Sequence, residues 1–195
     1  MSLPPGFPFV FVTGNAHKVA EVARITGGEV RSVAIDLPEI QSLDLREVLS
    51  AKAAEAFRRL QSPVVVEDVS LEIRAFGGFP GPLVKWMLEA LGAEGLARAA
   101  RAADRDAGWP DDTLGAVTAR CGLLYLDEGG EVFAEGVVEG HLIAPPRGDR
   151  GFGFDPIFQP LGSPHTFAEF SDAHKDLTGH RGLAWRALLG RLDLG

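Results

Sequence analysis

A run of three valines at positions 64–66 lies between segments that have the apolar spacing of helices. An uninterrupted β-branched run predicts a strand covered on both faces, because a strand with one wet face alternates apolar and polar residues. Sheets covered on both faces carry helices on either side. The run therefore indicates a layered α/β fold in which residues 64–66 form a central strand.

The preceding residues alternate between strand and helix in the same way. Strands are expected at 9–12 and 30–34, and helices at 16–25 and 45–60. Asn15 is a suitable N-cap for the first helix. Asp44, with Glu47 three residues later, resembles the capping box of the second helix, which Pro63 ends.

The rest of the chain adds a hairpin to this pattern. Further strands are expected at 71–75, 115–126 and 131–142, and helices at 83–91, 94–103 and 173–192, the last of them broken near Gly179. Asp127–Gly130 predicts a turn, so the two long strands pair antiparallel. Residues 144–162 are expected to form a loop. The sequence thus predicts a mixed α/β sheet in a single domain over residues 1–195, or two small lobes that share a core.

The composition excludes several partners and compartments. The net charge is −8, from 19 basic and 27 acidic residues, whereas proteins that wrap duplex nucleic acid present a basic face. The segment Met1–Phe11 has no positive start, and no apolar stretch is long enough for a bilayer, so neither a signal peptide nor a membrane partner is expected. The single cysteine, Cys121, excludes an internal disulfide and fits a cytoplasmic protein.

Lysine is scarce in this chain and therefore informative. Only four of the 19 basic residues are lysines, namely Lys18, Lys52, Lys85 and Lys175. A compact ammonium group suits a position beside a phosphate, so these four are candidates for a phosphate site. Codon preference is the other explanation.

The first candidate site is Thr13–Lys18, at a strand-to-helix junction. The N–H groups and the dipole at a helix N-terminus suit a phosphate, and Gly14 permits close approach of the backbone. The spacing is not that of a P-loop or a dinucleotide fingerprint. A capped helix with a solvated lysine is the alternative interpretation.

The second candidate site is the acidic pair Glu67–Asp68, which directly follows the valine run. The carboxyl ends of central strands are where α/β folds bind ligands. Adjacent carboxylates repel each other and favour a divalent cation, and oxygen ligands suit Mg²⁺. Glu39 is a third acid that could complete the metal site, and one carboxylate could take a proton from water. A strand end that meets solvent is the alternative.

Two further segments carry groups suited to a base. Gly151–Pro156 holds two phenylalanines between glycines, which offer flat faces for stacking, and Asp155 offers an acceptor. His180 and Arg181 can donate to a base carbonyl or a phosphate. Core packing is the alternative for the aromatic residues, and the histidines lack the partners of a zinc site.

Seven segments, in order along nearly the whole chain, match the pattern of one family. They are 11–18 (FVTGNAHK), 36–41 (DLPEIQ), 64–68 (VVVED), 77–86 (GGFPGPLVKW), 152–156 (FGFDP), 166–169 (TFAE) and 180–181 (HR). Each segment alone is weak, but the ordered set is specific. The chain resembles the inosine triphosphate pyrophosphatases, which cleave non-standard purine nucleoside triphosphates such as ITP, dITP and XTP.

The resemblance implies an elongated mixed sheet with flanking helices, a cleft between two lobes, and a homodimer. It implies Mg²⁺ bound by Glu39 and Asp68, and a catalytic pair, Glu67 and Asp68, in which Asp68 is the favoured base. Water would attack the α-phosphorus and release a nucleoside monophosphate and pyrophosphate. The substrate-binding residues that it implies are Thr13, Gly14, Asn15, Ala16, His17, Lys18, Lys52, Asp68, Val69, Lys85, Phe152, Gly153, Phe154, Asp155, Lys175, His180 and Arg181.

Four positions depart from the usual residues of this family. Val69 replaces a Ser or Thr, Phe154 a Tyr or Trp, Asp176 an Asn, and Gly179 a Ser. Asp176 is expected to add negative charge near the base pocket, and Gly179 to remove a capping or base-contacting hydroxyl. Substrate preference is therefore open, and two alternatives are a pyrophosphatase for other modified nucleotides and a non-catalytic nucleotide sensor. The retained acids speak against the sensor.

Overall fold

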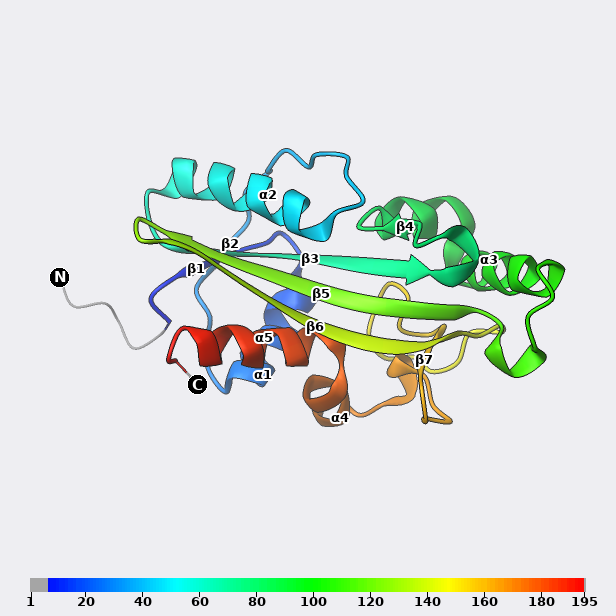
Figure 1. Cartoon of the computed structure of the whole chain (residues 1–195). Coiled ribbons are helices and arrows are strands. Elements are labelled where there is room, and N and C mark those ends of the chain that lie inside the picture. The colour runs from blue at the N-terminus through cyan, green and yellow to red at the C-terminus, as the bar shows by residue number, and fades with distance from the viewer. Residues whose placement is uncertain (1–6, 195) are drawn as a thin grey trace.

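A mixed β-sheet runs the length of the molecule (Figure 1). The computed structural model describes residues 7–194. In this range the strands are β1 (Val10–Val12), β2 (Ser32–Val33), β3 (Val64–Ile73), β4 (Pro80–Gly81), β5 (Ala116–Asp127), β6 (Gly130–Leu142) and β7 (Phe158–Pro160). They lie in the order β2-β1-β3-β5-β6-β7, and β4 pairs with β3. β1 is parallel to both of its neighbours, and all other pairs are antiparallel.

Helices cover both faces of this sheet. Within the described residues they are α1 (Ala16–Thr26), α2 (Leu45–Leu60), α3 (Val84–Asp106), α4 (Asp172–Thr178) and α5 (His180–Arg191). Figure 1 shows α2 on one face, α1 and α5 on the other, and α3 beside β4 at one end of the sheet. The predicted α/β fold with a mixed sheet is confirmed. The first six residues and the last residue of the predicted domain lie outside the described part of the chain.

Side-chain caps start the first two helices where the sequence predicts them. Oδ1 of Asn15 accepts hydrogen bonds from the backbone N–H groups of His17 and Lys18, at 2.9 and 3.3 Å. Asp44 caps α2 in the same manner. The expected capping box does not close, because the Glu47 carboxylate accepts from the Ser42 hydroxyl.

The strand β3 differs from the prediction of two separate extended pieces. It continues without a break from Val64 to Ile73, because the antiparallel ladder with β5 pairs every one of its residues, including Asp68 opposite Gly122. The acidic pair therefore lies in the middle of a strand, and the expectation that it ends a strand is wrong. The pair reaches a ligand site only because the shorter β1, on the other side of β3, has already ended at Val12.

Two other regions bear on the prediction. The two helices expected at 83–91 and 94–103 are confirmed as the two parts of α3, which meet at Gly92, where a φ of 68° and a ψ of 166° leave the helical conformation and suit only glycine. The predicted loop 144–162 contains the short strand β7, which pairs with β6 where Gly140 lets the two backbones approach closely. The break of the last helix at Gly179 is confirmed, since α4 ends and α5 begins there.

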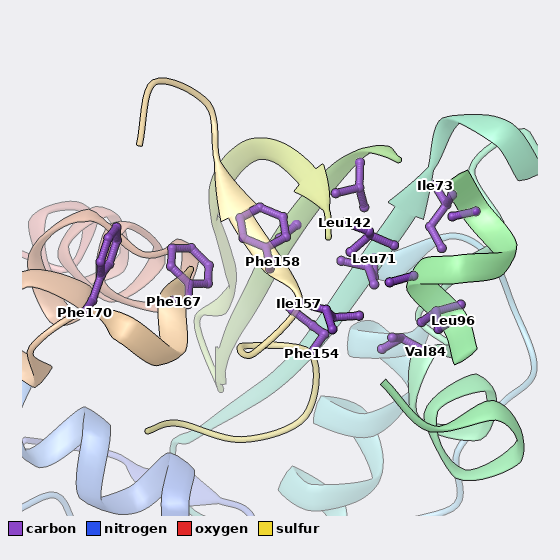
Figure 2. Close-up of a cluster of buried hydrophobic side chains, with 14 residues drawn as sticks. Leu71, Ile73, Val84, Leu96, Leu142, Phe154, Ile157, Phe158, Phe167 and Phe170 are labelled. Carbon is purple, nitrogen blue, oxygen red and sulfur yellow. The ribbon is translucent and has the colours of Figure 1, made fainter. Parts of the chain in front are cut away.

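Separate hydrophobic clusters define two lobes. At the end of the sheet near α3, Leu71, Leu96 and Phe158 belong to a cluster that Figure 2 shows in close-up. At the other end, one cluster under α5 contains Trp185, and another under α2 contains Leu49. The acidic pair lies between these lobes, in the middle of β3. No helix in residues 7–194 has the length and apolar character that crossing a membrane requires.

Candidate active site

A cavity of about 870 Å³ lies where the two lobes meet. Its wall combines segments that are far apart in the sequence, from the start of α1, the loop before α2, β3, the start of α3, the loop 152–155 and the start of α5. Among the residues predicted to be functional, it is lined by Thr13, Gly14, Asn15, Lys18, Glu39, Lys52, Glu67, Asp68, Val69, Lys85, Phe152, Gly153, Phe154, Asp155, His180 and Arg181. Ala16, His17 and Lys175 do not line it.

The junction between β1 and α1 forms one wall of the cavity. Asn15 occupies two of the first helical N–H groups with its own side chain, so these donors are not free as the sequence suggested. What this wall offers an anion is the helix dipole and the Nζ of Lys18. That Nζ lies 3.3 Å from Oε1 of Glu67.

Lys52 lies between two carboxylates on the face of the sheet that α2 covers. Its Nζ is 2.7 Å from Oε1 of Glu39 and 2.8 Å from Oδ2 of Asp68. Burial by itself would lower the pKa of Lys52, but the charge and hydrogen bond of Asp68 outweigh it and raise that pKa. Burial would raise the pKa of Glu39, yet the hydrogen bond from Lys52 lowers it. The other oxygen of Asp68 accepts from the backbone N–H of Val69, at 2.8 Å.

The neighbouring acid, Glu67, points to the opposite face of β3, because successive side chains alternate along a strand. Its side chain is fully buried, and Oε1 accepts from Nε of Arg181 at 3.0 Å. Oε2 accepts from the indole nitrogen of Trp185 at 3.3 Å. Burial would raise the pKa of Glu67, but the charge of Arg181 outweighs it and lowers that pKa. The two adjacent acids therefore belong to different sets of partners.

Glu21 supports the site although no sequence motif identifies it. It is 4% exposed, and its Oε2 accepts from Nη1 of Arg181 at 2.6 Å. Its other oxygen lies 3.7 Å from Nζ of Lys175. Glu21 follows Lys18 by three residues and so lies on the same face of α1. This spacing is the one sequence feature that could have placed Glu21 near the site. A glutamate inside a helix is more often solvated, so this signal is weak.

The loop that carries Phe152 is fixed by buried charges. Oδ2 of Asp155 accepts from the backbone N–H of Phe152 and from Nζ of Lys175, both at 2.7 Å. The Phe152 ring stacks on His17, with 5.4 Å between ring centroids, and lies 5.3 Å from the Arg181 guanidinium carbon. Lys175 thus acts on the cavity wall through Asp155 and does not line the cavity itself.

His180 combines burial with an unsatisfied polar atom. It is 2% exposed, lines the cavity, and its Nδ1 has no hydrogen-bond partner among residues 7–194. Burial, together with the charges of Arg181 and Lys175, holds the pKa of His180 well below its usual value, so the imidazole is neutral. Its ring packs against Phe154, which is itself buried in the cluster of Figure 2. The ring thus forms a neutral part of the cavity wall, and its buried Nδ1 is a polar atom that the described part of the chain leaves without a partner.

Three further positions singled out in the sequence lie at the rim of the cavity or outside it. The Lys85 side chain is 67% exposed at the rim, 4.0 Å from Glu89. Asp176 does not add charge to the cavity, because its carboxylate is bound by Arg24 of α1. Gly179 leaves the start of α5 without a side-chain cap, and a side chain there would collide with the carbonyl of Lys175.

The acidic residues present two oxygen ligands, not a complete metal cage. In the described part of the chain, no three His, Cys, Asp or Glu side chains gather into a metal-binding cluster. Glu39 and Asp68 share one cation, the Lys52 ammonium, and are therefore close enough to share another. Two carboxylates with substrate phosphates and waters are the set that Mg²⁺ commonly uses, so these residues fit the ion.

Comparison with known proteins agrees with this architecture. The Ham1 family matches residues 9–191. The chain is 40% identical over 177 residues to the inosine triphosphate pyrophosphatase of Schizosaccharomyces pombe, covering 90% of this chain and 89% of that protein. It is 37% identical over 182 residues to the dITP/XTP pyrophosphatase of Hyperthermus butylicus, with 92% and 91% covered. The solved structure of a HAM1 protein from Coxiella burnetii superimposes with a TM-score of 0.78 at 25% identity, covering 96% of this chain and 98% of that one. This chain therefore belongs to the Ham1 family.

Proposed function

We propose that this chain hydrolyses non-standard purine nucleoside triphosphates, namely ITP, dITP and XTP, to the nucleoside monophosphate and pyrophosphate. The observation that carries the proposal is the polarity of the cavity. One end holds two carboxylates with Lys52, and the other holds the Phe152 ring with the neutral imidazole of His180. A triphosphate suits the first end and a purine suits the second. Relatives named inosine triphosphate and dITP/XTP pyrophosphatase support the substrate class.

Glu39 and Asp68 are the residues that would hold Mg²⁺. The bound ion would neutralise phosphate charge and orient the triphosphate. Lys52 hydrogen bonds to both carboxylates in the free protein, so it is within reach of any phosphate that enters between them. Lys18 and Lys85 line the same cavity and would stabilise the charge on the leaving pyrophosphate.

Asp68 is the proposed general base. It would accept a proton from water while the water oxygen bonds to the α-phosphorus and the bond from that phosphorus to the bridging oxygen of pyrophosphate breaks. Glu67, which the resemblance places in the catalytic pair, would support this chemistry by holding Arg181 and Lys18 in place. Its buried carboxylate already accepts from Arg181 and Trp185.

Arg181 and His180 are the proposed readers of the base. Glu67 and Glu21 engage Nε and Nη1 of Arg181, whereas Nη2 donates to no side chain or carbonyl among residues 7–194. A guanidinium fixed in this way presents one donor to a purine 6-oxo group. Adenine carries an amino donor at that position and would leave the pocket's donors unpaired, a loss that can discriminate by about 10⁴-fold.

The proposal also includes a homodimeric assembly and a cytoplasmic location. A homodimer is the assembly that the resemblance implies, and light scattering after gel filtration tests it. A cytoplasmic location is supported by the single, buried Cys121, which needs no oxidising compartment.

The deciding experiment measures pyrophosphate release from ITP, XTP, GTP and ATP, with and without Mg²⁺. ITP and XTP should be turned over faster than GTP and ATP, and chelation of the metal should stop the reaction. Asp68→Asn should abolish turnover while nucleotide binding persists. Preference for another modified nucleotide would favour the alternative pyrophosphatase. Nucleotide binding without any product from the unmodified protein would make the chain a sensor.

A further inference from the structure

One face of α1 carries three charged residues at a spacing of three, Lys18, Glu21 and Arg24. Residues three apart are neighbours on a helix surface. Each of the three pairs with a different element: Lys18 with Glu67 on β3, Glu21 with Arg181 on α5, and Arg24 with Asp176 on α4. This helix face thus links the phosphate end of the cavity to the elements behind its base end. The last of these pairs has no part in the proposed function so far.

The pair formed by Arg24 and Asp176 is bidentate. Nε of Arg24 donates to Oδ2 of Asp176 at 2.7 Å, and Nη2 donates to Oδ1 at 3.1 Å. The Asp176 side chain is 12% exposed, so the pair is shielded from solvent on its acidic side. Hydrogen bonding to Asp176 raises the pKa of Arg24 despite partial burial. Parallel hydrogen bonds of this kind fix direction as well as distance.

The helix that this pair holds is short and carries a site residue. α4 has only seven residues, and helices of that length depend on tertiary contacts for their position. Lys175 precedes Asp176 directly, and its Nζ lies 2.7 Å from Oδ2 of Asp155. The same oxygen accepts from the backbone N–H of Phe152. A displacement of α4 would therefore pass through Lys175 and Asp155 to the ring proposed to stack on the base.

We propose that Arg24 and Asp176 are a positioning pair that sets the affinity of the base pocket by holding α4 against α1. The proposal rests on the proposed function, since it assigns the pair to the base half of that site. Neither residue lines the cavity, so the pair acts through Lys175 and the Phe152 loop. Its loss should weaken nucleotide binding and leave the chemical step at Asp68 unchanged.

The test compares Arg24→Ala, Asp176→Ala, the double variant and the reversed pair Arg24→Asp with Asp176→Arg. Each single variant should raise the KM for ITP roughly fivefold, or about 1 kcal/mol at 1.4 kcal/mol per factor of ten, with kcat within about twofold. The double variant should be no worse than either single variant, and the reversed pair should regain at least half of the lost affinity. Arg46→Ala, which removes an exposed pair with Glu131 on the opposite face of the sheet, is the matched control and should leave KM unchanged.

Three results would overturn the proposal. They are a lower melting temperature with an unchanged KM, a loss confined to kcat, and single effects that simply add in the double variant. Asp176→Asn keeps the shape of the side chain and serves if the alanine variant fails to fold. ITP affinity, measured by calorimetry in an Asp68→Asn background, tests the pair without turnover. A chain that releases no pyrophosphate at all would instead contradict the proposed function.

Discussion

Nζ of Lys52 lies 2.8 Å from Oδ2 of Asp68 and thereby occupies the carboxylate proposed to act as metal ligand and base. The same nitrogen also binds Glu39, at 2.7 Å. A divalent ion and the lysine therefore compete for one pair of carboxylates. A triphosphate relieves this competition, because it offers the ammonium group other oxygens. The nucleotide and the metal are thus expected to bind together.

The first prediction concerns this competition. Lys52→Met should tighten Mn²⁺ binding to the nucleotide-free protein by roughly tenfold, because a cation of like charge is removed from the site. Titration followed by electron paramagnetic resonance gives the affinity without any turnover. Arg46→Met removes a distant surface cation and should change nothing. Equal Mn²⁺ affinity of the Lys52→Met variant and the unmodified protein would exclude competition.

The second prediction separates the two adjacent acids. Glu67→Gln leaves the buried Arg181 with one fewer counter-charge, and breaking a buried ion pair costs about 3 kcal/mol or more. The free energy of unfolding, measured with urea, should fall by about that amount, whereas Asp68→Asn should lose turnover and little stability. Glu128→Gln, in the exposed turn between β5 and β6, is the stability control. A Glu67→Gln protein of normal stability that has lost turnover would assign Glu67 a direct catalytic role.

Much of the fold follows from local patterns in the sequence. The valine run, the Asn15 cap and the turn at 127–130 each specify their element through neighbours a few residues away. The full length of β3 and the existence of β7 do not follow in this way, since both depend on pairing with strands distant in sequence. β-Structure set by non-local pairing is the part that local spacing cannot supply.

The site follows the same division. Motif order indicated that Asp68 and Glu39 would be functional, the scarcity of lysine indicated Lys52, and the cavity brings the three together. Glu67 and Asp68 point to opposite faces of the sheet because β3 continues through both residues. The sequence did not indicate that the strand continues there. Glu21 was missed because one charged residue on a helix usually meets solvent. Asp176 was expected near the base, but its partner, Arg24, lies 152 residues away.

The third prediction is a pH dependence of stability that comes from His180. The folded protein holds its pKa well below 6.5, through burial first and then the charges of Arg181 and Lys175. Below pH 6.5 the unfolded chain binds a proton there that the folded chain does not, so stability must fall as pH falls. The slope approaches about 1.4 kcal/mol per pH unit near pH 5.

Urea unfolding between pH 5 and 7 measures this slope. His180→Gln should reduce the slope of stability against pH by up to about 1.4 kcal/mol per pH unit. His165→Gln, which replaces an exposed histidine, should keep the slope of the unmodified protein. Carboxylates contribute equally to both variants and cancel in the comparison. A His180→Gln variant with the same slope as the unmodified protein would show that the imidazole is not held neutral.

The fourth prediction concerns Gly136 on β6, over which α5 begins. A Cβ there would lie 2.5 Å from the backbone nitrogen of Ala184 and closer still to the carbonyl oxygen of His180. Both atoms belong to the backbone of α5 and cannot rotate away, so Gly136→Ala must push the helix off the sheet. Overpacking of this kind costs about 3 kcal/mol in the free energy of unfolding. It also moves His180 and Arg181, so ITP affinity should fall as well.

Urea unfolding tests the first effect, and calorimetry with ITP in an Asp68→Asn background, which prevents turnover, tests the second. Gly28→Ala is the control, because no heavy atom lies within 4 Å of its added Cβ, and its effect should stay within about 0.5 kcal/mol. If Gly136→Ala were as stable as the unmodified protein, α5 would not pack this closely on β6. The methyl group of Gly136→Ala must displace the start of α5 from the sheet. A Gly136→Ala protein that is destabilised yet binds ITP normally would therefore show that the start of α5 does not contact the base.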